Sequence, residues 1–504
     1  MKQTRTSLWQ AIASISIVTL LAGVLAGCAE KTPNEQSKGG GEASEPTEIS
    51  MMNVYFSGDA PNMNNNEYIK AIEDYTNTKL DFTWVPNSAY ADKFTVTLAS
   101  GQLPKTLLVL NAKTPAFISA VRDGAFWEIG PYIKQFTNLS RMKQNIFDST
   151  AIDGKIYGLF RPRPLAGIGI ILRKDWLDNL GLKEPQTLED LYQVIKAFTL
   201  NDPDKNGKND TFGFAENNVL NGFESLLVYY GGPNKWELAD GKLTPAHLTK
   251  EYVDVLKFYR RLVAEKLINP DFPLINETQK RDLIVKGKAG VTFSSMNTVT
   301  LLQDGGEKVN PAIKLDVLRT LNGPKGERAR GDTGFNGLFL FPKSSVKTEA
   351  ELLKILGFFD KLSDQTMQNL IEYGKEGTDY KLENGKAVKL DTARKDFPLY
   401  LPQLRVDDGS LLYEEKDLNP LDAKWKTLTA ANDQIAVLNP TAPLIVDLPK
   451  TQDISKIIPD ASTKYILGEI DEAAWLQAVE QWRKGGGDEQ IRLMNEAYGK
   501  LHKK

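Results

Sequence analysis

The hydrophobic positions of this chain repeat with two different periods, and each period predicts a different element. Short apolar runs of β-prone residues predict strands, whereas apolar residues three to four positions apart predict helices. Along the first quarter of the chain, the predicted elements are strands over 51–56, 80–84 and 107–110 and helices over 68–75 and 117–121. Strands that alternate with helices are typical of βαβ units, so the pattern predicts an α/β fold.

Helical periodicity dominates the middle and the end of the chain. Thr187 and Asp190 have the spacing of a capping box and precede apolar residues on one helix face. The same apolar spacing recurs over 252–262, 352–362 and 475–482. The chain is therefore expected to combine its strands with several amphipathic helices.

The first 28 residues combine a positive head, an apolar run and a cysteine that follows small residues. A mostly apolar stretch covers 8–24, and residues 25–27 (Leu-Ala-Gly) lead directly into Cys28. This pattern is typical of an export signal with a small-residue cleavage site, and it resembles a bacterial lipobox, in which the cysteine receives a lipid. An uncleaved membrane anchor and an ordinary signal with an accidental cysteine are the alternatives. We therefore expect a signal peptide over 1–27 and a palmitate-bearing lipoprotein on the outer face of the cell membrane.

The segment that follows the cysteine is polar and rich in glycine. Residues 28–47 contain too few apolar side chains to order themselves, so we expect a disordered tether. The remaining body is long enough for two or more domains of the usual size, about 100–200 residues each. The net charge is −3 for the whole chain and becomes −5 once the two cations of residues 1–27 are removed. Such a mildly acidic surface gives no electrostatic case for binding nucleic acid.

The scarcity of cysteine and histidine excludes several kinds of active site. Cys28 is the only cysteine, and His247 and His502 are the only histidines. Because the anchor uses Cys28, the body cannot form a disulfide or a cysteine-bound zinc site. The two histidines are too far apart in the sequence to form a His-x-x-x-His zinc pair. A Ser-His-Asp triad would depend on His247, and no Gly-x-Ser-x-Gly motif accompanies it. No second apolar run of about 20 residues predicts a transmembrane helix. These absences favour a protein that is not an enzyme.

Six segments, taken in order, resemble extracellular solute-binding proteins of carbohydrate ABC transporters. They are 124–133, 153–159 (Asp-Gly-Lys-Ile-Tyr-Gly-Leu), 173–182, 287–290, 373–380 (Tyr-Gly-Lys-Glu-Gly-Thr-Asp-Tyr) and 482–495. Together they span essentially the whole body behind the lipobox. The chain is most similar to the lipoprotein branch of this family, which is found in Gram-positive bacteria and is similar to oligosaccharide and alginate binders.

The resemblance implies a two-lobed α/β fold, like that of periplasmic binding proteins, with discontinuous lobes, hinge segments and a central ligand cleft. The first lobe is expected over 48–162 and 331–390, and the second over 163–330 and 391–504. The chain would cross between the lobes near 158–164, 330–334 and 379–400. The Arg-Pro-Arg-Pro sequence at 161–164 supports the first crossing, because proline stiffens a connector.

The function implied by the resemblance is transport rather than catalysis. Such a protein captures an oligosaccharide by hinge closure and delivers it to permease subunits of an ABC importer, and we expect it to be a monomer. Two alternatives remain open. One is a surface glycoside hydrolase or lyase, for which two carboxylates about 5–9 Å apart would suffice; the other is a receptor for a peptide or another solute. Sugar turnover would favour the enzyme, whereas saturable binding with lobe closure would favour the receptor.

A sugar site needs aromatic platforms and polar side chains, and position in the fold selects the candidates. Ligands of two-lobed α/β proteins lie beyond the carboxyl ends of strands and between the lobes. The candidate ligand-binding residues are Asp59, Asn62, Asn111, Trp127, Tyr157, Arg161, Trp236, Phe293, Arg330, Asp332, Phe335 and Tyr400, with Arg405 as a weaker one. Helix capping for the polar residues and core packing for the aromatic ones are the alternatives. An arginine would suit an acidic sugar, but the sequence leaves acidic and neutral sugars open.

One polar loop has the spacing of a calcium site. Residues 202–210 place oxygen-bearing side chains at positions 1, 3, 5 and 9 of an EF-hand loop and glycine at position 6. The expected ligands of a structural Ca²⁺ are Asp202, Asp204, Asn206, the carbonyl of Lys208 and Asp210. The loop departs from the EF-hand at position 12, where Gly213 replaces the bidentate glutamate. An ion-free Asp/Asn/Gly turn is the alternative, but the loop resembles one that binds calcium in alginate-binding relatives.

Overall fold

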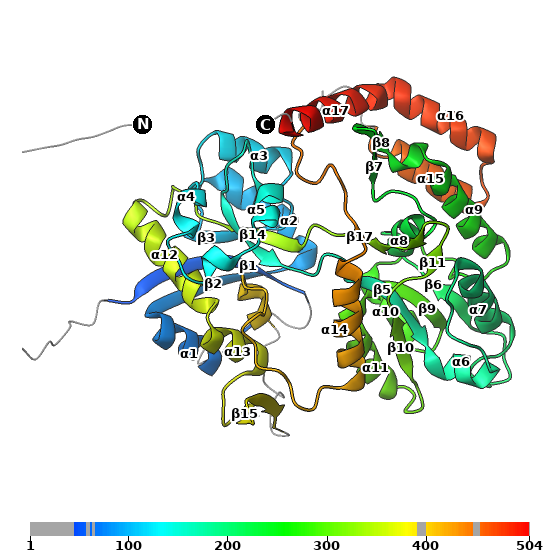
Figure 1. Ribbon diagram of the computed structural model, residues 1–504, viewed down its shortest axis with the longest axis horizontal. Helices are drawn as coiled ribbons and strands as arrows, with labels where there is room; N and C mark the ends of the chain where they lie inside the picture. The colour runs from blue at the N-terminus through cyan, green and yellow to red at the C-terminus, as the bar shows by residue number, and fades with distance from the viewer. Residues whose placement is uncertain (1–44, 57–60, 63–65, 391–399, 447–453, 503–504) are drawn as a thin grey trace, which may run out of the picture. The chain divides into compact units, whose positions relative to one another are not determined.

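The computed structural model describes residues 45–56, 61–62, 66–390, 400–446 and 454–502 (Figure 1). Met1–Glu45 and Pro46–Lys504 form two separate units, and the fold below is that of the second unit. The predicted signal peptide, Cys28 and most of the predicted tether lie outside the described residues. No helix in the described part of the chain is long and apolar enough to span a membrane.

The first sheet has the strand order β2-β1-β3-β14-β4. β1 pairs in parallel with β2 and β3, whereas β14 runs antiparallel to both β3 and β4. The strands are β1 (Thr47–Tyr55), β2 (Thr78–Pro86), β3 (Thr106–Val109), β4 (Gly158–Pro162) and β14 (Phe335–Leu340). Helices that share their core are α1 (Glu67–Thr76), α2 (Asn87–Ser100), α3 (Pro115–Arg122), α4 (Gly130–Ile133), α5 (Gln144–Thr150), α12 (Glu349–Leu362) and α13 (Gln365–Tyr373). We call this body the first lobe.

The second sheet has the strand order β10-β5-β9-β6. Its strands are β5 (Ile168–Arg173), β6 (Phe212–Ala215), β9 (Ala289–Ser295) and β10 (Leu315–Leu318). Its helices are α6 (Lys174–Leu180), α7 (Leu188–Leu200), α8 (Asn221–Tyr229), α9 (Lys250–Ala264), α10 (Glu277–Val285), α11 (Val299–Glu307), α14 (Pro420–Asp433), α15 (Ile457–Leu467), α16 (Glu472–Trp482) and α17 (Asp488–His502). We call this body the second lobe; β7 (Trp236–Ala239) and β8 (Lys242–Pro245) form a separate hairpin.

Several predicted elements are confirmed where local sequence decides the structure. The strand predicted over 107–110 is β3, and the strand predicted over 51–56 is the end of a longer β1. The capping box is present: Thr187 Oγ1 accepts from the Asp190 amide at 3.2 Å, and Asp190 Oδ2 accepts from the Thr187 amide at 3.0 Å. These features give the mixed α/β architecture that the alternating pattern predicts.

The first and second crossings between the lobes lie side by side. The Arg163 amide donates to the Gly334 carbonyl at 2.9 Å, and the Asp332 amide donates to the Leu165 carbonyl at 2.5 Å. The chain that leaves β4 therefore runs antiparallel to the chain that enters β14. This arrangement places the pocket described below next to two connecting segments.

The third crossing differs from the predicted boundary at 390–391. Leu401, Leu404 and Val406 are fully buried in the core of the first lobe. The chain reaches the second lobe at α14 (orange in Figure 1), whose Trp425 packs into a core with α11 and β10. Apolar residues beyond 391 thus keep the chain on the first lobe until it approaches residue 420.

Candidate functional site

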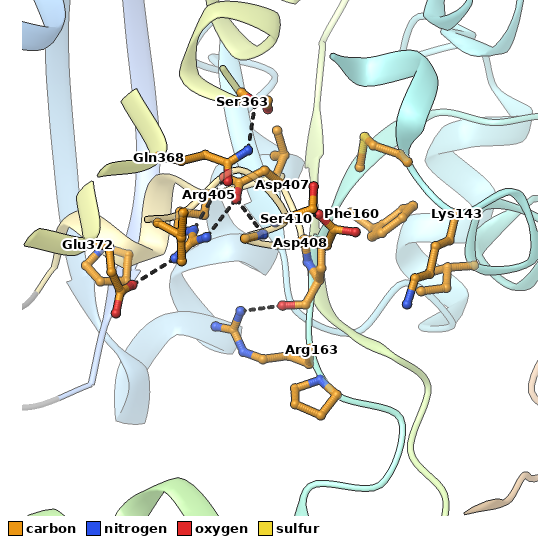
Figure 2. A pocket seen from close by; sticks show the side chains of 18 of the residues that line it. Lys143, Phe160, Arg163, Ser363, Gln368, Glu372, Arg405, Asp407, Asp408 and Ser410 are labelled. Carbon is orange, nitrogen blue, oxygen red and sulfur yellow. Dashed lines mark hydrogen bonds and ion pairs between the residues drawn. The ribbon is translucent and has the colours of Figure 1, made fainter. Parts of the chain in front are cut away.

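A cavity of about 670 Å³ has walls from both lobes. The first lobe contributes the end of β4, the start of α5, one side of α13 and residues 402–412, and the second lobe contributes Asn297 and α14. Figure 2 shows the polar side chains of this pocket, with Arg405 and Asp407 on one wall and Lys143 on another. Its position between lobes is the place where ligands of such folds usually bind.

Arg405 is the cation of the pocket that is already neutralised. It donates from Nη1 to Glu372 at 2.9 Å and from Nη2 to Asp407 at 2.7 Å. Burial alone would lower the pKa of Arg405, but these carboxylates reverse the effect and raise it. Figure 2 shows the guanidinium held between the two acids. Arg405 therefore stabilises the pocket wall, and its charge is already balanced by the two carboxylates before a ligand arrives.

Four other cations line the same pocket without a carboxylate partner among the described residues. They are Arg141, Lys143, Arg163 and Lys426. Arg141 donates to the Asn138 side chain at 2.8 Å, and Arg163 donates to the Pro162 carbonyl at 2.8 Å. All four residues are exposed to solvent. A ligand can therefore reach their charges without first breaking an ion pair.

The remaining acids of the pocket accept hydrogen bonds from neutral donors, and the charge of Lys143 also acts on Asp408, although these two described residues form no close ion pair. Asp433 Oδ1 accepts from the Ala166 amide at 2.9 Å, and Asp408 Oδ1 accepts from the Ser410 amide at 3.0 Å. The surrounding walls and the positive charge of Arg405 both lower the pKa of Arg163. A nearby anion would relieve this repulsion, so the arrangement suits a negatively charged ligand.

None of the twelve candidate residues predicted from the sequence lines this pocket. Tyr400 lies just before it, where its hydroxyl accepts from Asn66 Nδ2 at 2.5 Å and its ring lies 5.1 Å from Trp84. Asn62 and Asn111 are exposed, and the Asn111 side chain accepts from the Lys113 amide at 3.1 Å, which is a local turn. Asp59 lies outside the described residues.

Phe293 and Arg161 lie in the interior rather than on a pocket wall. β9 is a central strand, so Phe293 is 1% exposed and packs within 5.9 Å of Phe214 and 6.1 Å of Tyr229 between ring centroids. A buried ring cannot act as the sugar platform that the family resemblance implied for Phe293. Arg161 is 0% exposed and donates to protein carbonyls.

Several other candidates have local structural partners. Trp127 Nε1 donates to the Val346 carbonyl at 2.9 Å, and Asp332 Oδ1 accepts from the Thr333 amide at 2.7 Å. Arg330 pairs with Glu224 at 2.6 Å, beside a second cavity of about 380 Å³ in the second lobe. Tyr157, Trp236 and Phe335 are also half-buried. No candidate of the twelve that lies among the described residues lines either of these two cavities.

Arg405, a weaker candidate predicted from the sequence, does line the pocket, whereas the other four cations were not predicted, although one signal was available. Arg163 belongs to the Arg-Pro-Arg-Pro sequence whose prolines predict a stiff connector. Side chains alternate along a strand, so Arg161 and Arg163 leave β4 in similar directions, but only Arg163 lies past the strand end. Lys143 and Lys426 lie far apart in the sequence, and no local pattern predicts that they meet in one pocket.

The loop at 202–210 folds as a compact polar turn. Asp202 accepts from the amides of Asn206 and Gly207, each at 3.0 Å. Asn206 Nδ2 donates to Asp204 at 2.8 Å and to Asp210 at 3.2 Å, whereas the Lys208 side chain takes no part in these bonds. Among the described residues, no group of three or more His, Cys, Asp or Glu side chains is arranged to hold a metal ion.

Two details of this loop bear on the calcium prediction. Asp204 Oδ1 is buried and has no hydrogen-bond partner among the described residues, so it is available to a cation. The departure at position 12 has a steric cause, because a Cβ at Gly213 would lie 1.9 Å from the Ile195 carbonyl oxygen. A glutamate therefore cannot stand there, and any ion would depend on the first nine positions.

Comparison with known proteins identifies relatives over nearly the whole chain. The family model for "Bacterial extracellular solute-binding protein" matches residues 60–345, more than half of the chain. The polygalacturonan/rhamnogalacturonan-binding protein YtcQ of Bacillus subtilis (strain 168) is 38% identical over 494 residues, which cover 96% of this chain and 97% of that protein. Lipoprotein LipO of the same organism is 37% identical over 493 residues, which cover 95% and 97%.

The fold is also similar to that of a solved structure. The crystal structure of the alginate-binding protein AlgQ2 without calcium ion matches with a TM-score of 0.68, and the match covers 90% of this chain and 98% of that one. The two sequences are 19% identical, so this likeness concerns the fold alone.

Proposed function

We propose, from the premise that the chain belongs to the bacterial extracellular solute-binding proteins, that it captures an acidic oligosaccharide between its lobes for an ABC importer. Closure of the lobes would enclose the sugar, and the closed form would present it to the permease subunits. No covalent step is required, which agrees with relatives that are solute-binding proteins.

The observation that carries this proposal is the set of pocket cations that form no ion pair in the described part of the chain. Arg141, Lys143, Arg163 and Lys426 line one cavity of about 670 Å³ and are accessible to solvent. Uronic acid residues present carboxylates, which arginine binds through two parallel hydrogen bonds. The name of YtcQ, a polygalacturonan/rhamnogalacturonan-binding protein, supports a ligand of galacturonate type.

The anchor and the location follow from the N-terminal sequence. The lipobox-like residues 25–28 support lipid attachment at Cys28, and the similarity to lipoprotein LipO supports a protein held at the membrane. We place the body on the outer face of a Gram-positive cell membrane as a monomer, beside its permease. An acylated cysteine with more than one chain is a stable anchor.

A thermal-shift experiment tests the proposed ligand. The full chain in detergent is heated with trigalacturonate or with galactotriose, which has the same ring stereochemistry but no carboxylate. A ligand at about 100 times its dissociation constant stabilises a fold by about 2.7 kcal/mol. We expect a shift with trigalacturonate, a smaller one with galactotriose, and no cleavage product on chromatography. Cleavage would establish the enzyme alternative, and a shift with peptides alone would establish the other receptor.

We also propose that the loop at 202–210 holds a structural Ca²⁺. The unpartnered Asp204 Oδ1 supports this, because a hard cation needs carboxylate, amide and carbonyl oxygens of the kind present here. Asp202, Asp204, Asn206, the Lys208 carbonyl and Asp210 would be the ligands. The Lys288 ammonium, 2.7 Å from Asp210 Oδ2, would have to move away as the ion binds.

Melting temperature with and without calcium tests this second proposal. We expect chelation to lower the melting temperature of the wild type and to leave Asp204→Asn unchanged. Asp271→Asn is the matched control, because Asp271 lies outside the loop and should keep the response to calcium. A wild-type melting temperature that ignores both calcium and chelator would contradict the proposal.

A further inference from the structure

Arg161 is a buried cation that has no carboxylate partner in the described part of the chain. It lies in β4 and is 0% exposed, and its Nη2 has no hydrogen-bond partner. Burying an arginine in this way is costly, since neutral acceptors offset only part of the lost hydration. Burial accordingly lowers the pKa of Arg161. A side chain with this cost and no ion pair calls for a role beyond stability.

The acceptors of Arg161 belong to two different segments of the chain. Nε donates to the Asn336 carbonyl at 2.7 Å, and Nη1 donates to Gln403 Oε1 at 2.8 Å and to the Gln403 carbonyl at 3.3 Å. Asn336 lies where the pairing of β14 with β4 shifts register between Phe335 and Leu338. A bulge leaves a residue outside the ladder, so the Asn336 carbonyl is available to the guanidinium.

Two of the three residues adjoin a crossing between the lobes, and the third lies in a pocket wall of the first lobe. Arg161 comes just before the first crossing and Asn336 just after the second, whereas Gln403 belongs to the turn Leu401–Leu404 of the first lobe. The first two crossings are already joined by the hydrogen bond from the Arg163 amide to Gly334. Arg161 joins them to the first-lobe turn that contains Gln403, and Gln403 is further held by Asn53 Nδ2, which donates to its carbonyl at 3.2 Å.

Gln403 also connects this cluster to the candidate site. It lines the interlobe cavity, together with Pro162 and Arg163 from the first crossing. A shift of Gln403 would therefore move a pocket wall, and a shift of the crossings would alter the angle between the lobes. Arg161 is positioned to prevent both at once.

We propose that Arg161 is a positioning residue that ties the first two crossing segments to the pocket wall at Gln403, so that the lobes close as rigid bodies onto the ligand. The proposal rests on the proposed function, because it assumes that the pocket binds its ligand by closure. The planar fork of arginine can reach two segments at fixed angles, which a lysine ammonium cannot do. The candidate ligand contact predicted for Arg161 is thereby replaced by an indirect role.

This role can be tested directly by measuring the distance between the lobes. Cys28 is the only natural cysteine, so Lys134→Cys in the first lobe and Lys308→Cys in the second can carry spin labels in the full chain with Cys28→Ala. Both lysines are exposed. The interlobe distance distribution is measured by electron paramagnetic resonance with and without trigalacturonate, for the otherwise wild-type chain and for Arg161→Gln, Arg161→Lys and Gln403→Ala.

We expect Arg161→Gln to broaden the distance distribution even without ligand and to weaken trigalacturonate binding at least about tenfold, because three hydrogen bonds from a charged donor are lost. Arg161→Lys keeps the charge but not the fork, so it should not restore either property. Gln403→Ala removes one acceptor and should broaden the distribution less. Arg122→Gln is the matched control, since Arg122 pairs with Asp153 on the surface of the first lobe and should change nothing.

Two results would overturn the proposal. One is a wild-type distance distribution and affinity in Arg161→Gln, or in Gln403→Ala if Arg161→Gln does not fold. The other is full restoration by Arg161→Lys, which would assign the effect to charge and not to the fork. If the wild type binds no glycan, the proposed function fails, but the distances without ligand still test Arg161.

Discussion

Each lobe buries a charged side chain, and the two differ in how the charge is compensated. In the second lobe, Glu216 accepts from the amides of Asn217 at 3.0 Å and Gly222 at 2.9 Å and from the Tyr259 hydroxyl at 2.8 Å. Lys280, also fully buried, pairs with Glu277 at 2.9 Å. In the first lobe, Arg161 meets carbonyl and amide oxygens and no carboxylate among the described residues.

The difference separates a charge that stabilises one lobe from a charge that connects two. Burial raises the pKa of Glu216, and the positive charge of Lys280 opposes that rise. All groups of this network belong to elements of the second lobe, so it holds that lobe together. Arg161 instead spans segments that lead to the other lobe, so its removal should weaken ligand binding as well as stability.

The largest expected effect is on the stability of the second lobe. Lys280→Met removes the buried ammonium and leaves Glu216 without its cation, which should lower the free energy of unfolding by ~3–5 kcal/mol. Urea denaturation measures this loss. Lys286→Met is the control, because Lys286 pairs with Asp282 on the surface and should cost at most ~0.5 kcal/mol. Equal losses in the two variants would show that the network is not stabilising.

The corresponding change in the first lobe should cost less stability. Arg161→Gln leaves the Asn336 carbonyl without its donor, and we expect a loss of ~1–3 kcal/mol in the free energy of unfolding. The same urea measurement, set beside the tenfold loss of affinity, tests the contrast. A loss as large as that of Lys280→Met without a change in affinity would place Arg161 among ordinary core residues.

Arg163 should affect binding alone. Its guanidinium is exposed and donates only to the Pro162 carbonyl, among the described residues. Arg163→Gln should weaken trigalacturonate binding about tenfold, equivalent to ~1.4 kcal/mol, while the unfolding midpoint stays unchanged. Isothermal titration measures the affinity, and Arg122→Gln again serves as the control. Unchanged binding would remove Arg163 from the candidate site.

The smallest effect concerns an exposed cluster of the second lobe. The hydroxyl of Tyr192, followed by Arg261 and Lys196, lowers the pKa of Glu265 to about 2. Because the folded pKa is depressed, this stabilisation is present above the ordinary pKa of 4.5 and is lost as the pH falls through about 2. Glu265→Gln should cost no more than ~1 kcal/mol at neutral pH, since the cluster is screened by solvent. Its unfolding curve between pH 4.5 and 2 should be flatter than that of the wild type.

How far the sequence predicted this protein depends on the range of the interactions involved. The capping box at Thr187 and the strand that became β3 are decided by neighbouring residues, and both are confirmed. Phe293 follows a sequence typical of cleft aromatics, but it lies on a central strand, β9, and packs against Phe214 and Tyr229 in the core of the second lobe. That pairing brings together residues far apart in the chain, and no local pattern reports it.

The pocket cations are a further case of the same limit. Lys143 directly precedes α5, Arg163 lies at the first crossing, and Lys426 lies in α14. These residues therefore meet in one pocket only when the chain is folded. The sequence placed Arg161 near the first crossing, and it lies at the end of β4. Its burial could not be predicted, because the charged Arg-Pro-Arg-Pro sequence is typical of an exposed connector. Leu401, Leu404 and Val406 likewise extend the first lobe beyond the predicted boundary.

The most direct test of the central claim is the affinity ratio between trigalacturonate and galactotriose, measured by isothermal titration of the full chain. We expect trigalacturonate to bind at least about tenfold more tightly at low salt, because each carboxylate–arginine pair adds ~1–3 kcal/mol in a partly enclosed site. The ratio should shrink as the salt concentration rises. Equal affinity for the two trisaccharides at all salt concentrations would contradict the account.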